Sequence, residues 1–512
     1  MHSIDQLAGL DADALRELAA SLIDKVARLS EENRAKQLRI DQLTHEMALL
    51  KRWKFAARSE QLAGEQKALF DETLDADLEA IGLELEALGA TPAGSAAKQQ
   101  PRRALLPASL PRREIRHEPD STRCSCGCEL RRIGEDVAER LDYTPGTFTV
   151  ERHVRGKWAC AACGTLTQAP VPAHVIDKGI PTAGLLAQVL VSKYADHAPL
   201  YRQEQMFARA GLGIARSTLG AWVGACGVRL QPVVDALREA ILARPVLHAD
   251  ETPVAMLAPG NGKTHRAYLW GYGTTQLDAL QAVVYDFADG RAGRHAQAFL
   301  VNWRGTLVCD DYGGYKALFE RGAVTEAGCM AHARRRFHDL WAHHKSALAA
   351  EALGLFGALY EVERLGAKLD AQGRQRLREL RSRPIVDTLR EWLVLHRQRA
   401  TDGTAMARAI DYSLKRWRAL TRFLSDGAVP IDNNWIENRI RPVALGRANW
   451  LFAGSLRAGQ RAAAVMSLIQ SARLNAHDPY AYLKDVLERL PTQPNSRIEE
   501  LLPHRWMPSA AS

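Results

Sequence analysis

Three acidic residues in different local settings are candidates for a divalent-metal site. Asp250 in VLHADETPV and Asp310 in GTLVCDDYGGY each end a short apolar run that predicts a β-strand, and Glu437 in PIDNNWIENRIRP lies in a stretch with helical spacing. Carboxylates from adjacent strand ends and a facing helix can converge on a pair of Mg²⁺ ions, because hard cations prefer oxygen ligands. Such ions support phosphoryl transfer on nucleic acid. Acidic residues are common, so the surroundings must decide whether this triple is more than chance.

Five of the eight cysteines lie in one short segment, and in a reducing compartment this indicates a metal before a disulfide. Cys160 and Cys163 have the two-residue spacer of a zinc knuckle. Cys124, Cys126 and Cys128 offer three thiolates for the two remaining positions. Pairing of Cys124 with Cys126 and of Cys124 with Cys128 both stay open. We expect a structural Zn²⁺ site that contributes folding energy to a small module.

The N-terminal region has the apolar pattern of a coiled coil, with steps of four and three residues and no proline. The seam comprises Leu22, Val26, Leu29, Asn33, Lys36, Ile40, Leu43, Met47 and Leu50. A single Asn at an a position favours a parallel pair of helices, so the pattern predicts a homodimer or higher oligomer. A helix that folds back on its own chain explains the same pattern.

A helical segment before the strands has the form of a helix-turn-helix. One helix is expected to end near Ala210, glycines supply the turn, and a second helix begins at Arg216-Ser217-Thr218. In such a unit Arg216, Ser217 and Thr218 would contact the major groove. An ordinary helical hairpin is the equally supported alternative.

The order of elements predicts a multidomain α+β protein. Three strand-like runs and then strands alternating with helices are typical of a ribonuclease-H-like sheet. The expected order is a coiled coil (1–90), a linker (91–120), a zinc-binding module (121–175), a helix-turn-helix-like region (176–244), a ribonuclease-H-like α/β catalytic domain (245–455) with an α-helical insertion at about 340–425, and a helical C-terminal tail (456–512).

Composition and charge are those of a globular protein with a polyanionic partner. The formal net charge is +9, with a pI of about 9.1. No signal-like start or membrane-length apolar run is present, so we expect a cytoplasmic protein with no membrane partner. Basic residues near the second and third acids suit DNA phosphates, although a solvated helix face would look the same. They are His332, Arg334, Arg335, Arg336, Arg439, Arg441 and Arg447.

Long and unusual strings give the chain a more specific likeness. They include HADETPV, CDDYGGY, CMAHARRRF, PIDNNWIENRIRPVALGRANWLFAGS and LNAHDPYAYLKDVL. On these strings the chain resembles, nearly end to end, the large transposase of bacterial insertion sequences of family sixty-six, in the DDE superfamily. The resemblance implies a leucine-zipper-like N-terminus, a zinc-binding module and a ribonuclease-H-like catalytic domain. It also implies element-end DNA as substrate, target DNA, and companion proteins of the same mobile element.

The resemblance assigns the catalytic acids to Asp250, Asp310 and Glu437, which would hold two Mg²⁺ ions or Mn²⁺. Each has an acidic neighbour: Glu251, Asp311 and Asp432. Adjacent strand residues point to opposite faces, so Asp310 and Asp311 cannot both face one metal site, and the resemblance selects Asp310. Asp432 is better suited to cap the helix that carries Glu437.

Three positions depart from the family's usual residues. The first cysteine pair lacks the usual two-residue spacer, Ala448 stands where a Lys is usual, and Met330 replaces a usual Trp. None of them belongs to the acidic triad. The resulting hypothesis is a transposase that cleaves the terminal inverted repeats and joins the freed 3′-hydroxyl to target DNA. A non-catalytic DNA-binding protein and a nuclease that cleaves without joining are the rival classes.

Overall fold

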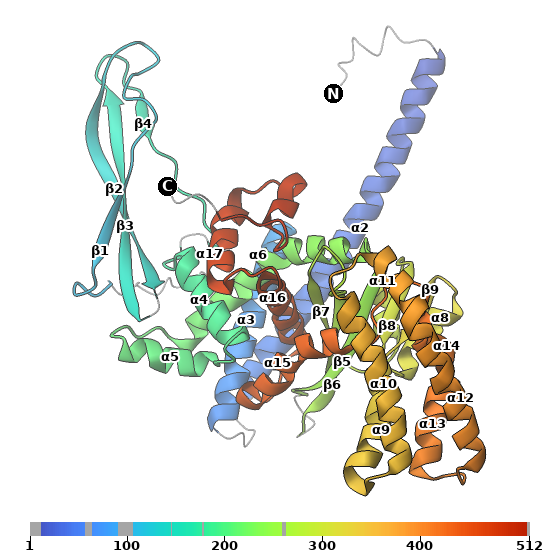
Figure 1. Ribbon diagram of the computed structural model, residues 1–512. Helices are drawn as coiled ribbons and strands as arrows, with labels where there is room; N and C mark the ends of the chain where they lie inside the picture. The colour runs from blue at the N-terminus through green and yellow to red at the C-terminus, as the bar shows by residue number, and fades with distance from the viewer. Residues whose placement is uncertain are drawn as a thin grey trace.

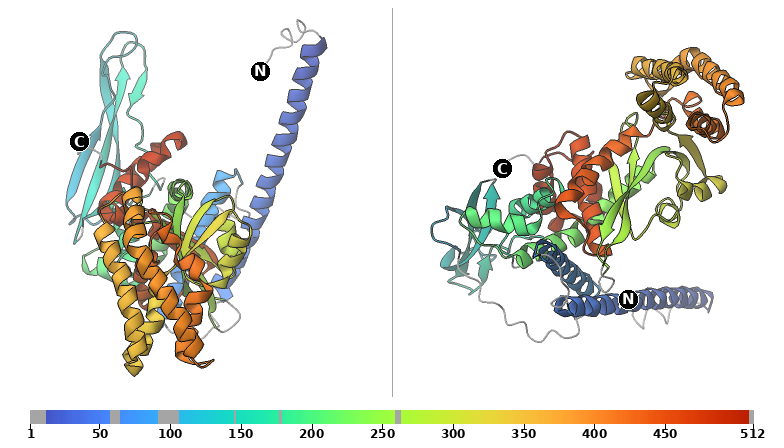
Figure 2. Two further views of the ribbon diagram at one scale, coloured as in Figure 1. Left: turned by 45° about the vertical axis from the view of Figure 1, so that its right-hand side comes forward. Right: turned by 90° about the horizontal axis from the view of Figure 1, so that it is seen from below.

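The protein is described by a computed structural model over residues 12–56, 64–90, 106–144, 146–176, 179–258 and 263–508. The first half of the expected linker, and the start of the expected coiled coil, lie outside these residues. Figure 1 shows a central body from which a long N-terminal helix and a β-stranded arm project separately. A bundle of helices extends from the body on a third side, as the second view of Figure 2 also shows.

A five-stranded mixed sheet lies in the body. Its strands are β5 (Val246–Met256), β6 (His265–Thr274), β7 (Val283–Ala288), β8 (Gly305–Cys309) and β9 (Val324–Gly328). The order is β7-β6-β5-β8-β9: the first three strands pair antiparallel, whereas β8 is parallel to β5 and β9 to β8. Parallel neighbours need crossover connections, and α7 (Arg294–Phe299), η1 (Gly313–Tyr315) and α8 (Lys316–Glu320) lie in them. Three consecutive strands followed by alternation with helices is the order predicted from the sequence.

Two helices that follow the sheet in sequence cover it. They are α15 (Asn434–Trp450) and α16 (Leu456–Leu474). Helix α16 lies along β7, where the hydroxyls of Ser467 and Ser471 accept hydrogen bonds from strand N–H groups at 2.8 and 3.0 Å. Helix α15 reaches β6 because that strand carries glycine at the contact: a Cβ on Gly273 would lie 2.6 Å from the Trp435 ring. This close approach brings the first turn of α15 to the sheet.

The expected helical insertion is present between β9 and α15. It comprises α9 (Met330–His344), α10 (Ala347–Gly366), α11 (Ala371–Leu377), the π-helical segment η2 (Arg378–Ser382), α12 (Arg383–Arg399), α13 (Ala405–Lys415), α14 (Trp417–Leu420) and η3 (Arg422–Leu424). These helices enclose a hydrophobic core of their own around Phe337, Phe356 and Leu389. Val246 and Val308 of the sheet belong to the same core, so the insertion is fixed to the catalytic strands.

The cysteine-rich region differs from the compact module that its sequence predicts. It forms a long arm of β1 (Arg112–His117), β2 (Leu130–Thr144), β3 (Thr147–Cys160) and β4 (Leu166–Gln168), in which β2 and β3 pair antiparallel over almost their whole length. Fourteen residues of β3 span about 45 Å at the usual rise per residue. Buried residues alternate at Phe148 and Val150, the period expected for a strand with one covered face. The spacing of the cysteines alone carries no information on this length.

The helices between the arm and the sheet anchor the arm. They are α4 (Ala183–Tyr194), α5 (Leu200–Arg209) and α6 (Arg216–Leu242). Phe207 of α5 packs edge-on against Tyr143 and Phe148, with ring centroids 5.3 Å away in each case. The β2–β3 turn is therefore the fixed end of the arm, and the cysteines lie at the opposite, distal end.

The C-terminal tail is helical, as predicted. It contains α17 (Pro479–Arg489) and the 3₁₀ segments η4 (Leu490–Thr492) and η5 (Asn495–Leu501). The indole N–H of Trp506 donates to the Asp485 carboxylate at 2.7 Å, which ties the last described turn back to α17. Within the described ranges, no helix is both long and apolar enough to cross a membrane.

The N-terminal helices divide the predicted coiled-coil seam into two parts. Helix α2 (Ala12–Ala56) is followed by α3 (Gly64–Ala87). Leu43, Met47 and Leu50 at the C-terminal end of the seam are buried against α3. This half of the seam folds back on its own chain, which is the alternative that the pattern left open.

The N-terminal half of the seam is exposed, so its pairing with a second copy of the chain remains a prediction. Leu22, Val26 and Leu29 are 52%, 65% and 45% exposed. We expect Val26→Asp with Leu29→Asp to halve the mass measured by light scattering, because both face the predicted partner helix. Ala35→Asp, on the outer face of the same helix, is the matched control and keeps the larger mass. A monomeric wild-type chain at micromolar concentration would refute the prediction.

Candidate active site and metal centre

The three predicted acids lie at one edge of the sheet and on the helix that covers it. Asp250 is within β5, Asp310 directly follows β8, and Glu437 is in the first turn of α15. Strands β5 and β8 are parallel neighbours with His248 opposite Val308. Two residues further on, the same register brings Asp250 beside Asp310.

Burial and neighbouring charges act on the Asp250 carboxyl. The pKa of Asp250 is raised from 3.8 to about 8, first by burial and then by the charges of Glu251, Glu437 and Asp310. The charges of these neighbouring acids disfavour ionisation of the buried Asp250 carboxyl. The ligand atoms of Asp250, Asp310 and Glu437 do not all lie within 4.8 Å of one another. A bound divalent cation, which takes carboxylate oxygens as ligands, would favour the charged form of Asp250.

Two of the acidic neighbours are occupied elsewhere. Glu251 accepts hydrogen bonds from Arg291 at 2.6 Å and from the Tyr315 hydroxyl at 2.9 Å. Asp311 forms an ion pair with Arg416 of the insertion. Each neighbour thus points to a structural partner.

The third neighbour, Asp432, stabilises the start of α15. Its carboxylate accepts from the backbone N–H of Asn434 at 3.1 Å and from the Tyr360 hydroxyl at 2.8 Å. Such bonds satisfy donors that the first turn of a helix leaves free. The helix begins at Asn434, one residue later than the sequence suggests.

A buried polar network fixes α15 to β5 and was not anticipated from the sequence. The His248 ring contacts the Asn433 side-chain oxygen at 2.7 Å, and the Asn433 amide donates to the carbonyl of Ala249 at 2.9 Å. The His248 ring also stacks on Trp435, with centroids 5.6 Å apart. Satisfied buried networks impose one geometry. The network sets the position of Glu437 relative to Asp250. In the sequence, only the polar residues of the strings HAD and DNNW could have indicated it.

Arg416 connects the insertion to the second acid. Its guanidinium pairs with Asp311, lies 2.7 Å from Glu326 and donates to the backbone carbonyl of Asp310 at 3.2 Å. The side chain is only 8% exposed, so these bonds form in a poorly screened environment. Arg416 is therefore a positioning residue for Asp310.

Basic side chains of α9 surround the third acid. His332 Nδ1 lies 3.7 Å from Glu437 Oε1, and Arg335 Nη2 lies 3.9 Å from Glu437 Oε2. Arg334 and Arg336 are exposed on the same helix. The predicted basic run is thus next to the acidic site and open to solvent.

Basic side chains of α15 extend the same surface. Arg441 and Arg447 are exposed, and Arg447 donates to the carbonyl of Pro253 in β5 at 2.7 Å. Arg439 is half-buried over the Trp435 ring, 5.0 Å from its centroid. Two of these three guanidinium groups therefore have protein contacts that orient them.

The predicted helix-turn-helix has the expected helix ends but a buried second helix. Helix α5 ends at Arg209, and Gly211 adopts a φ of +90° in the turn. Helix α6 packs so closely on α3 that a Cβ at Gly224 would lie 2.2 Å from the Ala76 carbonyl oxygen. The alternative of a helical hairpin accounts for this packing.

The three residues predicted to contact the major groove differ in exposure and in their protein contacts. Arg216 lies 3.6 Å from Asp71 of α3, and its backbone N–H donates to Glu204 at 3.0 Å. Ser217 is exposed and Thr218 is half-buried. Contact of these three residues with DNA stays a prediction, and the Arg216 side chain would have to leave Asp71 to make it.

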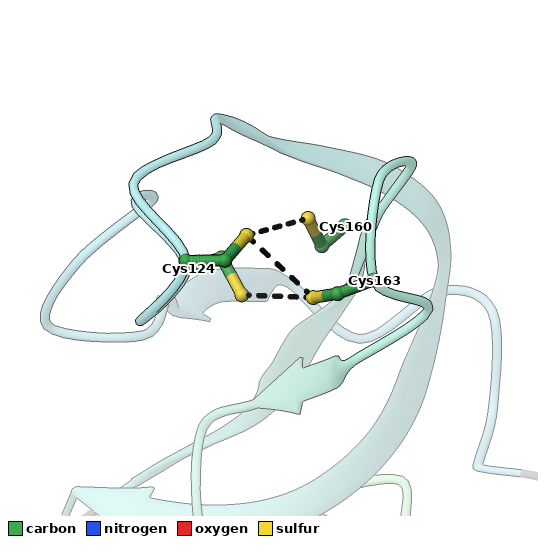
Figure 3. A group of neighbouring side chains, drawn as sticks. Cys124, Cys160 and Cys163 are labelled. Atoms are coloured by element: carbon green, nitrogen blue, oxygen red, sulfur yellow. Dashed lines mark hydrogen bonds between the residues drawn. The ribbon is translucent and has the colours of Figure 1, made fainter.

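Four cysteines converge at the distal end of the arm, where two loops face each other (Figure 3). The Sγ atoms of Cys124 and Cys163 are 3.3 Å apart, and that of Cys126 lies 3.6 and 3.7 Å from those of Cys160 and Cys163. Zn–S bonds of about 2.3 Å in a tetrahedron separate sulfurs by about 3.8 Å, so the cluster fits one Zn²⁺. Cys128 lies outside the group, and its carbonyl accepts from the Cys124 N–H at 2.8 Å.

Backbone amides favour the thiolate forms of Cys124 and Cys160, whereas neighbouring cysteine side chains raise the pKa of Cys126. The amide N–H of Cys126 lowers the pKa of Cys124, and the amides of Cys163 and Ala162 lower that of Cys160. Among the described residues of the arm tip, the apolar cluster around these cysteines adds Leu130 and the half-buried Trp158. With so small a core, the metal must contribute much of the folding energy of the tip.

Cys126→Ser is expected to release this zinc ion, whereas Cys128→Ser keeps it. Loss of one of four thiolates leaves an incomplete closed site, and the tip then opens. Limited proteolysis in residues 121–164 and the zinc content per chain measure both effects. Loss of zinc in Cys128→Ser with retention in Cys126→Ser would reverse the ligand assignment.

The mixed sheet has one acid within β5, one directly after β8 and one on a facing helix, and together with the family match it indicates a DDE-type catalytic domain. Sequence comparison gives the family. Residues 178–461, more than half of the chain, match the Transposase IS66 family, and the chain belongs to that family. The IS66 C-terminal element matches residues 467–504, the zinc-finger binding domain of transposase IS66 residues 121–164, and the Transposase C of IS166 homeodomain residues 42–115.

Two similar proteins come from Sinorhizobium fredii (strain NBRC 101917 / NGR234). The uncharacterized protein y4jD is 38% identical over 416 residues, which are 78% of this chain and 81% of the relative. The uncharacterized protein y4qI is 36% identical over 508 residues, 96% of this chain and 94% of the relative. The likeness to y4qI thus includes the arm and the N-terminal helices as well as the catalytic domain.

Proposed function

We propose that this chain binds the ends of an insertion sequence and catalyses divalent-metal-dependent strand cleavage and strand transfer, with Asp250, Asp310 and Glu437 as its catalytic acids. The observation that carries the proposal is the placement of Asp250 and Asp310 on adjacent parallel strands, with Glu437 in the first turn of the helix that covers them. Burial, and then the charges of Glu251, Glu437 and Asp310, raise the pKa of Asp250 to about 8. A cluster of like charges at the edge of a sheet is costly for folding, and it is useful where cations bind.

The chain's own residues supply positioning. Asp250 and Asp310 are held on adjacent strands, and Glu437 is held by the His248–Asn433 network. Bound Mg²⁺ or Mn²⁺ would activate the attacking oxygen and stabilise the departing 3′-oxygen. The acids therefore act as ligands, and no side chain has to form a covalent bond to DNA.

The basic helices next to the acids would hold the DNA backbone. Arg335 of α9 lies 3.9 Å from Glu437, and Arg334, Arg336, Arg441 and Arg447 are exposed on the same two helices. Forked guanidinium donors bind phosphate oxygens in a bidentate manner. Such contacts fix the position of the scissile phosphate over the metal ligands, and they predict binding that weakens with salt.

The substitution pair Asp310→Asn and Asp311→Asn tests the site most directly. We expect Asp310→Asn to lower cleavage of labelled element-end DNA by at least about 10²-fold, because it removes a ligand at the reacting phosphate. Asp311→Asn keeps the second acid in place and loses only one partner of Arg416. Gel assays with Mg²⁺ measure cleaved and joined products.

The same assay separates the proposal from its rivals. Joined product in the wild type excludes a nuclease that cleaves without joining, and cleavage excludes a non-catalytic DNA-binding protein. Full activity of Asp310→Asn with an inactive Asp311→Asn would overturn the assignment of the second acid. Absence of cleavage by the wild type with companion proteins present would overturn the proposed activity.

A further inference from the structure

A second group of metal-ligating side chains lies where α9 and α15 begin. Cys329 is the N-cap residue of α9, His332 is in its first turn, and Glu437 is in the first turn of α15. One ligand atom from each, a sulfur, an imidazole nitrogen and a carboxylate oxygen, lies within 4.8 Å of the other two. The spacing of three residues places Cys329 and His332 on the same side of the helix.

Two of these ligand atoms are buried and have no hydrogen-bond partner among the residues that the structure describes. They are His332 Nδ1 and Glu437 Oε1. They lie 3.7 Å apart, which is too long for a hydrogen bond between them. Buried polar atoms are nearly always paired, so this pair of atoms indicates a missing partner. A cation between them would accept a lone pair from each.

The third ligand is already oriented. Cys329 is fully buried, and its Sγ accepts the backbone N–H of Asn433 at 3.2 Å. Asn433 is the residue that fixes α15 to β5, so the network that positions Glu437 also holds the sulfur. Hydrogen bonds to ligand atoms of this kind orient metal sites.

We propose that Cys329, His332 and Glu437 bind a zinc-class cation, separate from the four-cysteine cluster. Sulfur, imidazole and carboxylate together suit Zn²⁺, whereas Mg²⁺ takes oxygen ligands and does not select a thiolate. Three protein ligands leave a fourth position open, as in exchangeable zinc sites.

Glu437 belongs to this site and also to the proposed catalytic triad. Occupation by zinc draws Glu437 toward His332 and removes a ligand from the site formed with Asp250 and Asp310. Zinc at this position therefore inhibits the Mg²⁺-dependent reaction. This consequence rests on the proposed function, whereas zinc binding itself does not.

Zinc stoichiometry tests the binding directly. The full-length wild type, titrated with Zn²⁺ at micromolar concentration and analysed for bound metal, is expected to hold two ions per chain. His332→Ala and Cys329→Ser are each expected to hold one, and Ser at 329 still accepts the Asn433 N–H. Arg334→Ala, an exposed neighbour on the same helix, is the matched control and holds two. The retained ion at the four-cysteine cluster shows that each variant is folded.

A single ion per wild-type chain, or two ions in both His332→Ala and Cys329→Ser, would overturn the proposed site. Asp250→Asn, which lies outside it, keeps two ions whether or not the proposed function is right. For inhibition, zinc at saturation is expected to lower wild-type cleavage at least tenfold relative to its zinc-free rate. Cys329→Ser, compared with its own zinc-free rate, is expected to lose this sensitivity. Equal zinc sensitivity of the two proteins would overturn the inhibitory role and leave the proposed function intact.

Discussion

Asp250→Asn is expected to abolish strand cleavage and, at the same time, to stabilise the metal-free protein. Loss of the Asp250 carboxylate, a proposed metal ligand at the reacting phosphate, should lower the cleavage rate by at least about 10²–10³-fold. The gain in stability arises because the Asp250 carboxyl is largely buried and lies near the charges of Glu251, Glu437 and Asp310. A neutral amide of the same shape removes that repulsion.

The pH dependence gives the sign and the size of the stability gain. The pKa of Asp250 is about 8 in the folded chain, above its ordinary value of 3.8. A group with a raised folded pKa contributes stability that is complete below the lower value and is lost as the pH rises through the higher one. The metal-free wild type should therefore become less stable between about pH 4 and pH 8. This titration disappears in Asp250→Asn.

At pH 7 the raised pKa of Asp250 lowers the free energy of unfolding of the metal-free wild type by about 4 kcal/mol relative to a pH below 3.8, since each pKa unit corresponds to about 1.4 kcal/mol. Burial of the Asn amide offsets part of it, so we expect a gain of about 2–4 kcal/mol in the free energy of unfolding. Urea denaturation in a chelator at pH 5 and pH 8 measures it. Added Mn²⁺ should then stabilise the wild type more than the variant. A variant that is less stable than the metal-free wild type at pH 8 would contradict the clustered geometry.

The sequence allowed prediction of the sheet because its signals are local, whereas the choice of Asp250, Asp310 and Glu437 as catalytic acids rested on the family resemblance and stays a prediction. Apolar runs mark β5 and β8, with Asp250 within the first and Asp310 directly after the second. Parallel pairing of neighbouring strands then brings the two acids to one edge without further information. The helical insertion was equally predictable, since long helical periodicity needs no tertiary contact to be recognised.

Features that depend on distant contacts were not predictable. The length of the β2–β3 arm depends on pairing across a turn, and nothing in the spacing of Cys124 and Cys160 encodes it. The bond of Asn433 to Ala249 joins residues 184 positions apart in sequence. The division of the coiled-coil seam near Ile40 also depends on a tertiary contact, because the position of α3 decides which half of the seam is covered.

Asp77→Ala is expected to destabilise the protein by about 3–5 kcal/mol, the usual cost of leaving a buried charge without its partner. Asp77 of α3 is fully buried, pairs with Arg461 of α16 at 2.9 Å and accepts from the Ser455 hydroxyl. Arg461 is itself only 7% exposed, so its charge cannot be solvated once the carboxylate is gone. Chemical denaturation of the full chain measures the loss.

Two further variants show whether the loss comes from the unpaired charge. Asp77→Ala combined with Arg461→Met removes both charges and should recover at least half of the lost stability, because no buried ion then remains. Glu500→Ala breaks the exposed pair with Arg497 and should cost under about 1 kcal/mol. If Asp77→Ala costs no more than Glu500→Ala, α3 is not held to the catalytic core by this pair. Recovery in the double variant would show that the loss comes from the unpaired Arg461 charge. Helix α3 and helix α16, which covers the sheet, would then be in contact at this position with or without the ion pair.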